Sequence, residues 1–181
     1  MKSNKKIYLA CFGVVIFLFA AGKVLDLIVA QQFAKPILSG PYKVLHVVDG
    51  DTFDVKINGL RKRIRSLGLD TPETVDPRKS VQCFGVEASN KAKEILNSQT
   101  VFLEADSSQA NLDKYGRLLR YAWLRDGINF SEIMIRQGYA REYTYLGNPY
   151  KYQIRFKQAQ QEAVGAGRGL WSADNCASNV I

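Results

Sequence analysis

Apolar and polar residues alternate along the chain after residue 41 with the period of two that is typical of β-strands. We predict a first strand over 42–48 and a second over 52–57, with the turn residues Asp49-Gly50-Asp51 between them. Asn58-Gly59, a frequent two-residue hairpin turn, leads into a third strand over 63–69. These segments predict an antiparallel meander of three strands.

The rest of the chain mixes helical periodicity with two more short apolar segments. Pro72 ends the third strand because proline cannot donate to a strand ladder. Asn129 is a suitable N-cap for a helix that Gly138 ends. The predicted elements are a helix over 86–97, strands over 101–105 and 118–124, a helix over 129–137 and a helix over 150–164. Five short strands with inserted helices predict an α+β fold, a five-stranded Greek-key β-barrel of the OB type with about three helices.

A separate hydrophobic segment precedes this domain. Three lysines stand before an uncharged apolar run over 7–21, which is the pattern of a secretory signal. The run is short for a transmembrane helix, so a cleaved signal peptide and a retained N-terminal membrane anchor both stay open for residues 1–30. Both predict an extracytoplasmic domain, either secreted or anchored to the membrane by this segment alone. We expect a linker over 31–41, the domain over 42–176 and a tail over 177–181.

The composition is basic, because 25 Lys and Arg residues against 17 Asp and Glu residues give a formal net charge of +8. A basic chain favours polyanionic partners such as nucleic acids, since binding releases the counterions condensed on phosphate backbones. A solubilising surface would have the same composition. The chain has one histidine and no Cys-x-x-Cys spacing, which argues against a zinc site.

The three cysteines agree with export. Cys11 lies in the apolar run, where it is a small hydrophobic residue. Cys83 and Cys176 lie in the mature part, and oxidising conditions outside the cytoplasm favour a disulfide between them. Two unrelated thiols are the alternative.

Three aspartates end or begin neighbouring predicted strands. Asp49 and Asp51 flank Gly50 and project to the same face of an extended chain, although an ordinary turn would also contain them. Asp70 closes the third strand, and the hairpin register brings that strand end beside Asp51. Carboxylates gathered at one place repel one another unless a cation intervenes. All-oxygen ligands suit calcium or magnesium.

Arginines form a matching positive set at Arg63, Arg65 and Arg117. A guanidinium group binds phosphate with two parallel hydrogen bonds and stays charged at any relevant pH. A solvated basic strand edge is a strong alternative for Arg61, Lys62 and Arg63, and a weaker one for Arg65. Since the single histidine, His46, lies within a strand, a general base would be a carboxylate, for which Glu73 is the candidate.

Five motifs together resemble the staphylococcal-nuclease-like (thermonuclease) family. The motifs are Val48-Asp49-Gly50-Asp51-Thr52, Arg65-x4-Asp70-Thr71-Pro72-Glu73-Thr74, Phe84-Gly85-Val86-Glu87-Ala88-Ser89, Asp113-Lys114-Tyr115-Gly116-Arg117 and Gly169-Leu170-Trp171. They occur in the family's order over about residues 42–175. The resemblance implies an OB-type barrel and Ca²⁺-dependent hydrolysis of DNA and RNA to 3′-phosphate products, with single-stranded substrates favoured and a monomeric enzyme.

The resemblance also implies roles for individual residues. Asp51 and Asp70 would be the metal carboxylates, the Thr71 carbonyl a third ligand and Asp49 a secondary contributor. The catalytic residues would be two arginines that bind the scissile phosphate and a glutamate that orients or deprotonates the attacking water: Arg65, Arg117 and Glu73. The residues that would contact the nucleotide are Lys114, Tyr115 and Tyr143. The segments 74–82 and 142–148 depart from the family pattern, which affects the tyrosine assignment and the substrate preference.

Two rival functions are compatible with the same fold. A binding-only OB module would keep the barrel without turnover, but such modules usually lose a site carboxylate or arginine, and none is missing here. A structural or surface protein would bind no calcium at this site. A calcium effect on activity and on thermal stability distinguishes the three.

Overall fold

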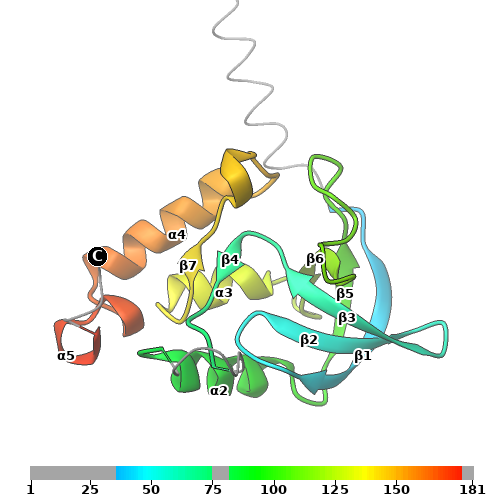
Figure 1. Cartoon of the computed structure of the whole chain (residues 1–181), viewed down its shortest axis with the longest axis horizontal. Coiled ribbons are helices and arrows are strands. Elements are labelled where there is room, and N and C mark those ends of the chain that lie inside the picture. The colour runs from blue at the N-terminus through cyan, green and yellow to red at the C-terminus, as the bar shows by residue number, and fades with distance from the viewer. Residues whose placement is uncertain (1–35, 75–81, 177–181) are drawn as a thin grey trace, which may run out of the picture. The chain divides into compact units, whose positions relative to one another are not determined.

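Five strands form a closed barrel in the computed structural model, which describes residues 36–74 and 82–176. The strand order around the barrel is β1–β2–β3–β6–β5 (Figure 1). The strands are β1 (Ser39–Val47), β2 (Thr52–Ile57), β3 (Leu60–Ser66), β5 (Thr100–Glu104) and β6 (Leu118–Trp123). Neighbouring strands are antiparallel except for β3 and β6, which are parallel. The predicted five-stranded OB-type barrel is confirmed.

Three longer helices and several short elements complete the domain (Figure 1). The helices are α2 (Gly85–Leu96), α3 (Phe130–Arg136), α4 (Gln153–Gly165) and the short α5 (Ala173–Cys176). A second, two-stranded sheet joins β4 (Leu69–Asp70) to β7 (Arg141–Glu142), and the 3-10 turns are η1 (Tyr145–Gly147) and η2 (Gly169–Trp171). The sequence predicted the three longer helices and missed these short elements.

The core follows from the alternation of the strands and from one face of each helix. Phe53 and Val55 of β2 point into the barrel beside Ile64 of β3, and all three are fully buried. Phe53 meets the α3 residue Phe130 edge to face, with ring centroids 6.1 Å apart. Helix α2 buries residues four apart, because these share one face of a helix: Ala88, Ala92 and Leu96.

The predicted ends of α3 are confirmed. The side chain of Asn129 accepts a hydrogen bond from the backbone N–H of Glu132, as an N-cap should. Gly138 follows the helix with φ 78°, and a Cβ atom there would lie 2.2 Å from the carbonyl oxygen of Arg168. Only glycine allows the two chain segments to approach so closely.

Two predicted boundaries differ from the structure near the candidate site. The third strand ends at Ser66 instead of residue 69, because Gly68, with φ 76°, turns the chain and places Leu69 and Asp70 in the separate strand β4. The first strand begins at Ser39, so residues 39–41 of the predicted linker pair with the barrel.

Helix α4 begins at Gln153, three residues later than predicted, because the residues before it are fastened to the barrel. The backbone N–H of Lys151 donates to Asp106, and its amino group contacts Glu104 at 2.6 Å. Glu104 also accepts hydrogen bonds from the hydroxyl of Tyr152 and the indole of Trp123. The barrel therefore carries a buried acidic anchor for the start of α4.

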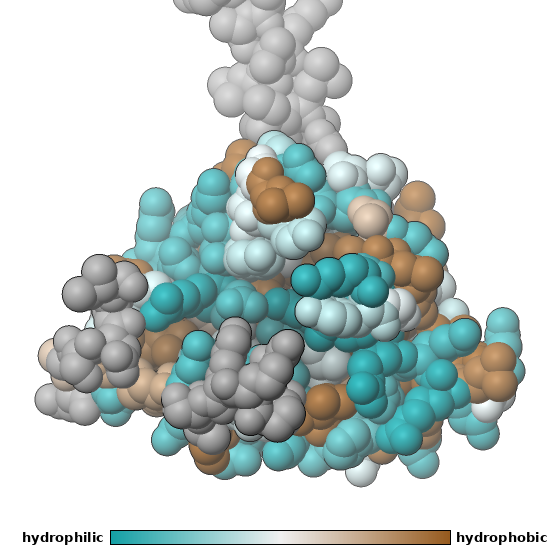
Figure 2. All heavy atoms as spheres, in the orientation of Figure 1, coloured by the Kyte–Doolittle hydropathy of each residue, from teal (hydrophilic) through white to brown (hydrophobic). Residues whose placement is uncertain are grey.

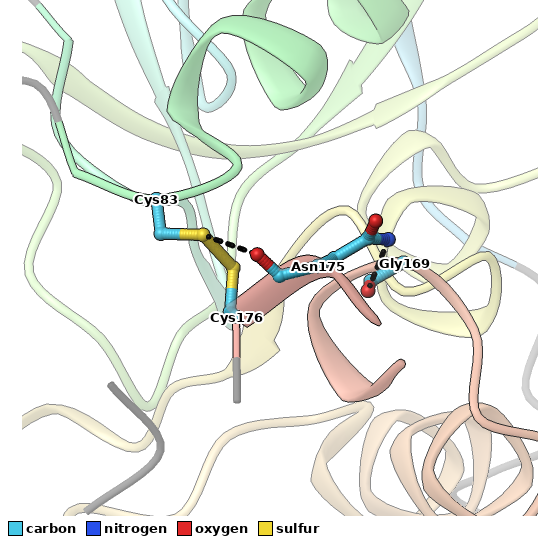
Figure 3. Close-up of a disulfide and its surroundings, with 4 residues drawn as sticks. All are labelled: Cys83, Gly169, Asn175 and Cys176. Atoms are coloured by element: carbon cyan, nitrogen blue, oxygen red, sulfur yellow. Dashed lines mark hydrogen bonds between the residues drawn. A yellow bond between two sulfur atoms is a disulfide. The ribbon is translucent and has the colours of Figure 1, made fainter. Parts of the chain in front are cut away.

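Cys83 and Cys176 are joined by a disulfide, as the sequence predicted (Figure 3). The bond links the turn before α2 to the end of α5, across 93 positions of sequence. Beside it, the side-chain amide of Asn175 donates to the carbonyl of Gly169 at 3.0 Å. The disulfide thus ties the C-terminal elements to the helix that follows the candidate site loop.

Several predictions fall on residues that the structure does not describe. The hydrophobic segment 1–30, the tail 177–181 and residues 31–35 of the linker lie outside the described residues, as do residues 75–81. In the two described ranges, no helix combines the length and the apolar composition needed to cross a bilayer.

Replacing both Cys83 and Cys176 with serine should lower the free energy of unfolding by about 2–4 kcal/mol, because the unfolded chain loses a long covalent loop. Urea denaturation without reductant measures the difference. Dithiothreitol should destabilise the wild-type protein by a similar amount and leave the double variant unchanged. An equal response of both proteins to the reductant would contradict the prediction.

Candidate active site

A tight turn between β1 and β2 carries the first acidic residues. One carboxylate oxygen of Asp49 accepts hydrogen bonds from the backbone N–H groups of Asp51 at 3.0 Å and Thr52 at 2.8 Å. This is an Asx turn, so the ordinary turn role applies to Asp49 together with its place at the site. A Cβ atom on Gly50 would lie 2.6 Å from the methyl group of Thr71, so glycine lets the turn pack directly on the loop after β4.

Arg65 lies at the centre of the site and joins its two main carboxylates. Its Nη2 atom lies 3.1 Å from Oδ2 of Asp51 and 2.9 Å from Oδ1 of Asp70. Its Nη1 atom donates to the backbone carbonyls of Ser66 and Leu69, both at 2.8 Å. Asp51 and Asp70 therefore face one common point, as predicted, although Asp70 reaches it from β4 and not from the end of the third strand.

Asp51 is buried and fully engaged by its neighbours. Its Oδ1 accepts a hydrogen bond from the hydroxyl of Thr52 at 2.8 Å, and its Oδ2 accepts one from the hydroxyl of Thr71 at 3.2 Å. The backbone N–H of Thr71 also points to Oδ2, at 3.4 Å. Thr71 thus contacts Asp51 through its hydroxyl and backbone N–H, whereas the role predicted for its carbonyl as a metal ligand stays a prediction.

Arg117 reaches the same place from the loop before β6. Its Nε donates to Asp113 at 2.6 Å and its Nη1 donates to the hydroxyl of Thr52 at 3.2 Å. Asp113 also accepts from the backbone N–H groups of Tyr115 and Arg117, which closes the loop. Burial opposes ionisation of Asp113, but these hydrogen bonds outweigh it and lower its pKa.

Burial makes ionisation of two carboxylates at this edge of the site unfavourable. Burial and the nearby charge of Asp51 raise the pKa of Asp49 to about 6. Burial also raises the pKa of Asp70; the guanidinium of Arg65 opposes this rise, and the charges of Asp51 and Glu73 add to it. A cation bound here would stabilise the ionised form of each carboxylate.

Glu73 lies on the loop that follows β4, and its negative charge contributes to the raised pKa of Asp70. Its carboxylate accepts a hydrogen bond from the backbone N–H of Thr74 at 2.9 Å. Its backbone is held by Gln82, which exchanges two hydrogen bonds with it at 2.8 and 3.0 Å. Two hydrogen bonds therefore join Glu73 and Gln82, which flank residues 75–81.

The predicted nucleotide contacts lie at the rim of the site. Tyr115 is 68% exposed, and its ring lies 5.0 Å from the amino group of Lys114 and 5.4 Å from the guanidinium carbon of Arg117. Tyr143 is half-exposed, and its backbone N–H donates to Gly68 in the turn that precedes Asp70. Tyr115 thus lies on the loop that carries Arg117. Tyr143 directly follows β7 and lies beside the turn that precedes Asp70.

Arg63 does not join this group and belongs instead to the basic strand edge that the sequence offered as its alternative. It forms two hydrogen bonds to the buried carboxylate of Asp54, at 2.9 and 3.2 Å. The hydrogen bond to Asp54, with smaller contributions from the charges of Asp54 and Asp49, raises the pKa of Arg63. Sequence reasoning assigned no role to Thr52 and Asp113, which contact Arg117, nor to Asp54, which pairs with Arg63 outside the site. The hairpin register sets Asp54 opposite Arg63, and the four-residue spacing of Asp113 from Arg117 allows an ion pair. Both residues could therefore have been identified from the sequence.

The carboxylates of Asp51 and Asp70 are the main oxygen ligands that this site offers to a divalent cation. No group of three or more Asp, Glu, His or Cys residues that could hold a metal ion is found in 36–74 or 82–176. Two carboxylates that face one point, which a guanidinium nitrogen occupies, fit a hard cation whose other ligands are hydroxyl, carbonyl or water oxygens. The residues present therefore fit a hard divalent cation with a mixed oxygen shell.

Comparison with known proteins places this chain in one family. Residues 63–173 match the family described as Staphylococcal nuclease homologue. The chain is 44% identical over 131 residues to a thermonuclease of Staphylococcus hyicus, covering 72% of this chain and 75% of the relative. A thermonuclease of Staphylococcus intermedius is 43% identical over 130 residues, with the same two shares. Endonuclease YncB of Bacillus subtilis (strain 168) is 40% identical over 155 residues, which cover 82% of this chain and 72% of that relative.

Replacing Asp49 with asparagine should raise the free energy of unfolding at pH 7 in a chelator by about 1–2 kcal/mol. The asparagine oxygen can still accept the two backbone hydrogen bonds, while the buried charge is removed. Since the raised pKa of Asp49 destabilises the fold only where the carboxylate is ionised, the gain should shrink as the pH falls from about 6 towards 3.8. Urea denaturation at several pH values measures this gain in the free energy of unfolding. A loss of stability that does not depend on pH would contradict the prediction.

Proposed function

Because this chain belongs to the staphylococcal nuclease family and is a nuclease, we propose that it hydrolyses DNA and RNA in the presence of Ca²⁺ to products that end in a 3′-phosphate. The observation that carries the proposal is the convergence of Arg65 and Arg117 on the Asp51-Thr52 segment. Arg65 contacts Asp51, and Arg117 contacts Thr52. Two guanidinium groups beside an acidic edge suit a phosphodiester, which carries negative charge and must become electrophilic.

Asp51 and Asp70 would hold the calcium ion, with Thr71 beside them and Asp49 contributing its charge from the turn. When bound, the cation polarises a non-bridging phosphate oxygen and so makes phosphorus more electrophilic. The raised pKa values of Asp49 and Asp70 support this assignment, because burial disfavours each ionised carboxylate and a bound cation would stabilise the ionised form. The family resemblance favours calcium within the class of hard cations.

Arg65 and Arg117 would bind the scissile phosphate and stabilise the charge that develops in the transition state. Their guanidinium groups are held before substrate arrives, Arg65 by two backbone carbonyls and Arg117 by Asp113. A phosphate oxygen would compete with Asp51 and Asp70 for the Nη2 hydrogens of Arg65. Binding of the phosphate would thus exchange one negatively charged partner of Arg65 for another, while the backbone carbonyls hold the other end of the guanidinium group.

Glu73 would orient the attacking water and accept its proton, because a carboxylate is the base that the site offers. The loop around it is pinned through Gln82, which fixes its backbone relative to Asp70. Attack in line with the leaving 5′ oxygen leaves the phosphate on the 3′ side. The role of Glu73 is thus to direct a water, and that of the arginines is to hold the phosphate.

Lys114, Tyr115 and Tyr143 would contact the nucleotide at the rim. An exposed tyrosine ring offers a stacking surface to any base, which supports acceptance of both DNA and RNA and a preference for unpaired strands. We further propose that the domain acts as a monomer outside the cytoplasm, either secreted or anchored to the membrane by residues 1–30. The basic net charge favours binding of a polyanion.

Replacing Arg117 with alanine, or Glu73 with glutamine, should lower kcat on single-stranded DNA by roughly 10²–10³, the loss typical of one transition-state donor. Initial rates with calcium at saturating substrate measure this. Arg125→Ala, which removes an exposed arginine from the turn after β6, is the matched control and should keep wild-type rates. Near-native rates of both site variants would refute the assigned roles, and a wild-type protein that binds DNA without cleaving it would indicate a binding module.

Calcium at 100 times its dissociation constant should raise the free energy of unfolding by about 2.7 kcal/mol, because it binds the folded chain alone. Thermal unfolding with calcium and then with a chelator measures the shift. Asp70→Asn should abolish most of it, whereas Asp126→Asn, at an exposed turn, should leave it intact. The same calcium shift in Asp70→Asn as in the wild type would show that the ion binds elsewhere.

A further inference from the structure

The outward face of the β2–β3 hairpin carries a row of arginines that continues away from the candidate active site. Arg61, Arg63 and Arg65 are alternate residues of β3, so their side chains leave the strand on one face. Lys56 of β2 pairs with Arg61 and extends the row at the hairpin end. Figure 2 shows hydrophilic atoms over much of the face that carries this hairpin.

Asp54 holds the first two arginines of this row in place. Its side chain is 1% exposed and lies between Nε of Arg61 at 3.0 Å and Nε of Arg63 at 2.9 Å. Within the described residues, these two arginines form ion pairs with no other carboxylate. Two guanidinium groups on one carboxylate leave a net positive charge, so the pairing orders the arginines without neutralising them.

The arginines keep donors for a further partner. A guanidinium group has five N–H donors, of which Arg63 uses two in hydrogen bonds to Asp54, while Arg61 forms an ion pair with the same carboxylate. The side chains of Arg61 and Arg63 are 59% and 50% exposed. Charged, ordered and half-exposed donors of this kind bind phosphate oxygens well, because the side chains lose little freedom on binding.

We infer that Arg61 and Arg63 bind the phosphates that follow the scissile phosphate along an extended single-stranded polynucleotide. The inference rests on the proposed function, in which Arg65 contacts the scissile phosphate. Alternate side chains of a strand repeat at about 6.7 Å, which is comparable to the distance between successive phosphates of an extended nucleic acid strand. A polynucleotide suits this row of arginines because its phosphates are negatively charged and because the row continues directly from Arg65.

Contacts of this kind read the backbone and not the bases, so they should act equally on DNA and RNA. They should also require a chain of several nucleotides, because a substrate with a single phosphodiester cannot reach from Arg65 to Arg61. The hairpin would thus make the enzyme prefer polynucleotides over dinucleotides.

The test uses the full-length triple variant Asp54→Asn/Arg61→Gln/Arg63→Gln, which removes the buried carboxylate together with both of its partners. On DNA and RNA 12-mers, KM should rise roughly five- to twenty-fold while kcat stays close to that of the wild type. The slope of log(kcat/KM) against log[salt] should become shallower by about 1.4, or about 0.7 for each lost phosphate contact. On a dinucleotide with one phosphodiester, kcat/KM should change little.

Lys62→Gln is the matched control, because it removes the same net charge from the same hairpin on the opposite face of β3. It should leave KM and the salt slope close to those of the wild type. Arg61→Gln alone leaves Asp54 paired with Arg63, so it should fold even if the triple variant does not, and it should show about half the change in slope.

The outcomes separate this inference from the proposed function. A wild-type protein that cleaves neither 12-mer with calcium refutes the proposed function. Wild-type cleavage combined with equal KM and salt slope for Arg61→Gln and Lys62→Gln refutes the inference alone. Equal losses on the 12-mers and the dinucleotide would also overturn it, since they would indicate a structural effect on the site.

Discussion

The ion pairs of Arg65 with Asp51 and Asp70 are the interaction on which the site depends. One carboxylate comes from the turn before β2 and the other from β4, and without a positive charge between them they would repel each other. Nη2 of Arg65 lies within 3.1 Å of both, while Nη1 holds the carbonyls on either side of the Gly68 turn. The same guanidinium therefore sets the path of the chain after β3 and gathers the acidic groups that suit a cation.

The other functional groups are positioned by short turns that pack on this centre. Asp49 fixes the turn that presents Asp51, and Asp113 fixes the loop that presents Arg117. Thr52 connects the two, because its hydroxyl donates to Asp51 and accepts from Arg117. Each group is thus held by local hydrogen bonds on a rigid barrel, which is the arrangement that preorganised electrostatic catalysis requires.

Much of this arrangement could be predicted from residues close together in sequence. The two-residue turn Asn58-Gly59 fixes the hairpin register, and that register alone places Thr52 opposite Arg65 and Asp54 opposite Arg63. The cap at Asn129 and the spacing of the five motifs are equally local. The same register explains why Arg63 pairs with Asp54 and lies outside the site, because it sets the two residues opposite each other.

The sequence by itself determined the five strands, the three longer helices, the family and the residue types of the site, because periodicity, turn residues and motif spacing are local properties. The tertiary structure alone decided that β3 stops at Ser66, that Glu104 and Asp106 delay the start of α4, and which groups Arg65 joins. It also brought Cys83 and Cys176 into a bond. These features depend on contacts that only the folded chain makes, such as that of Glu104 with Lys151, and no local pattern records such distances.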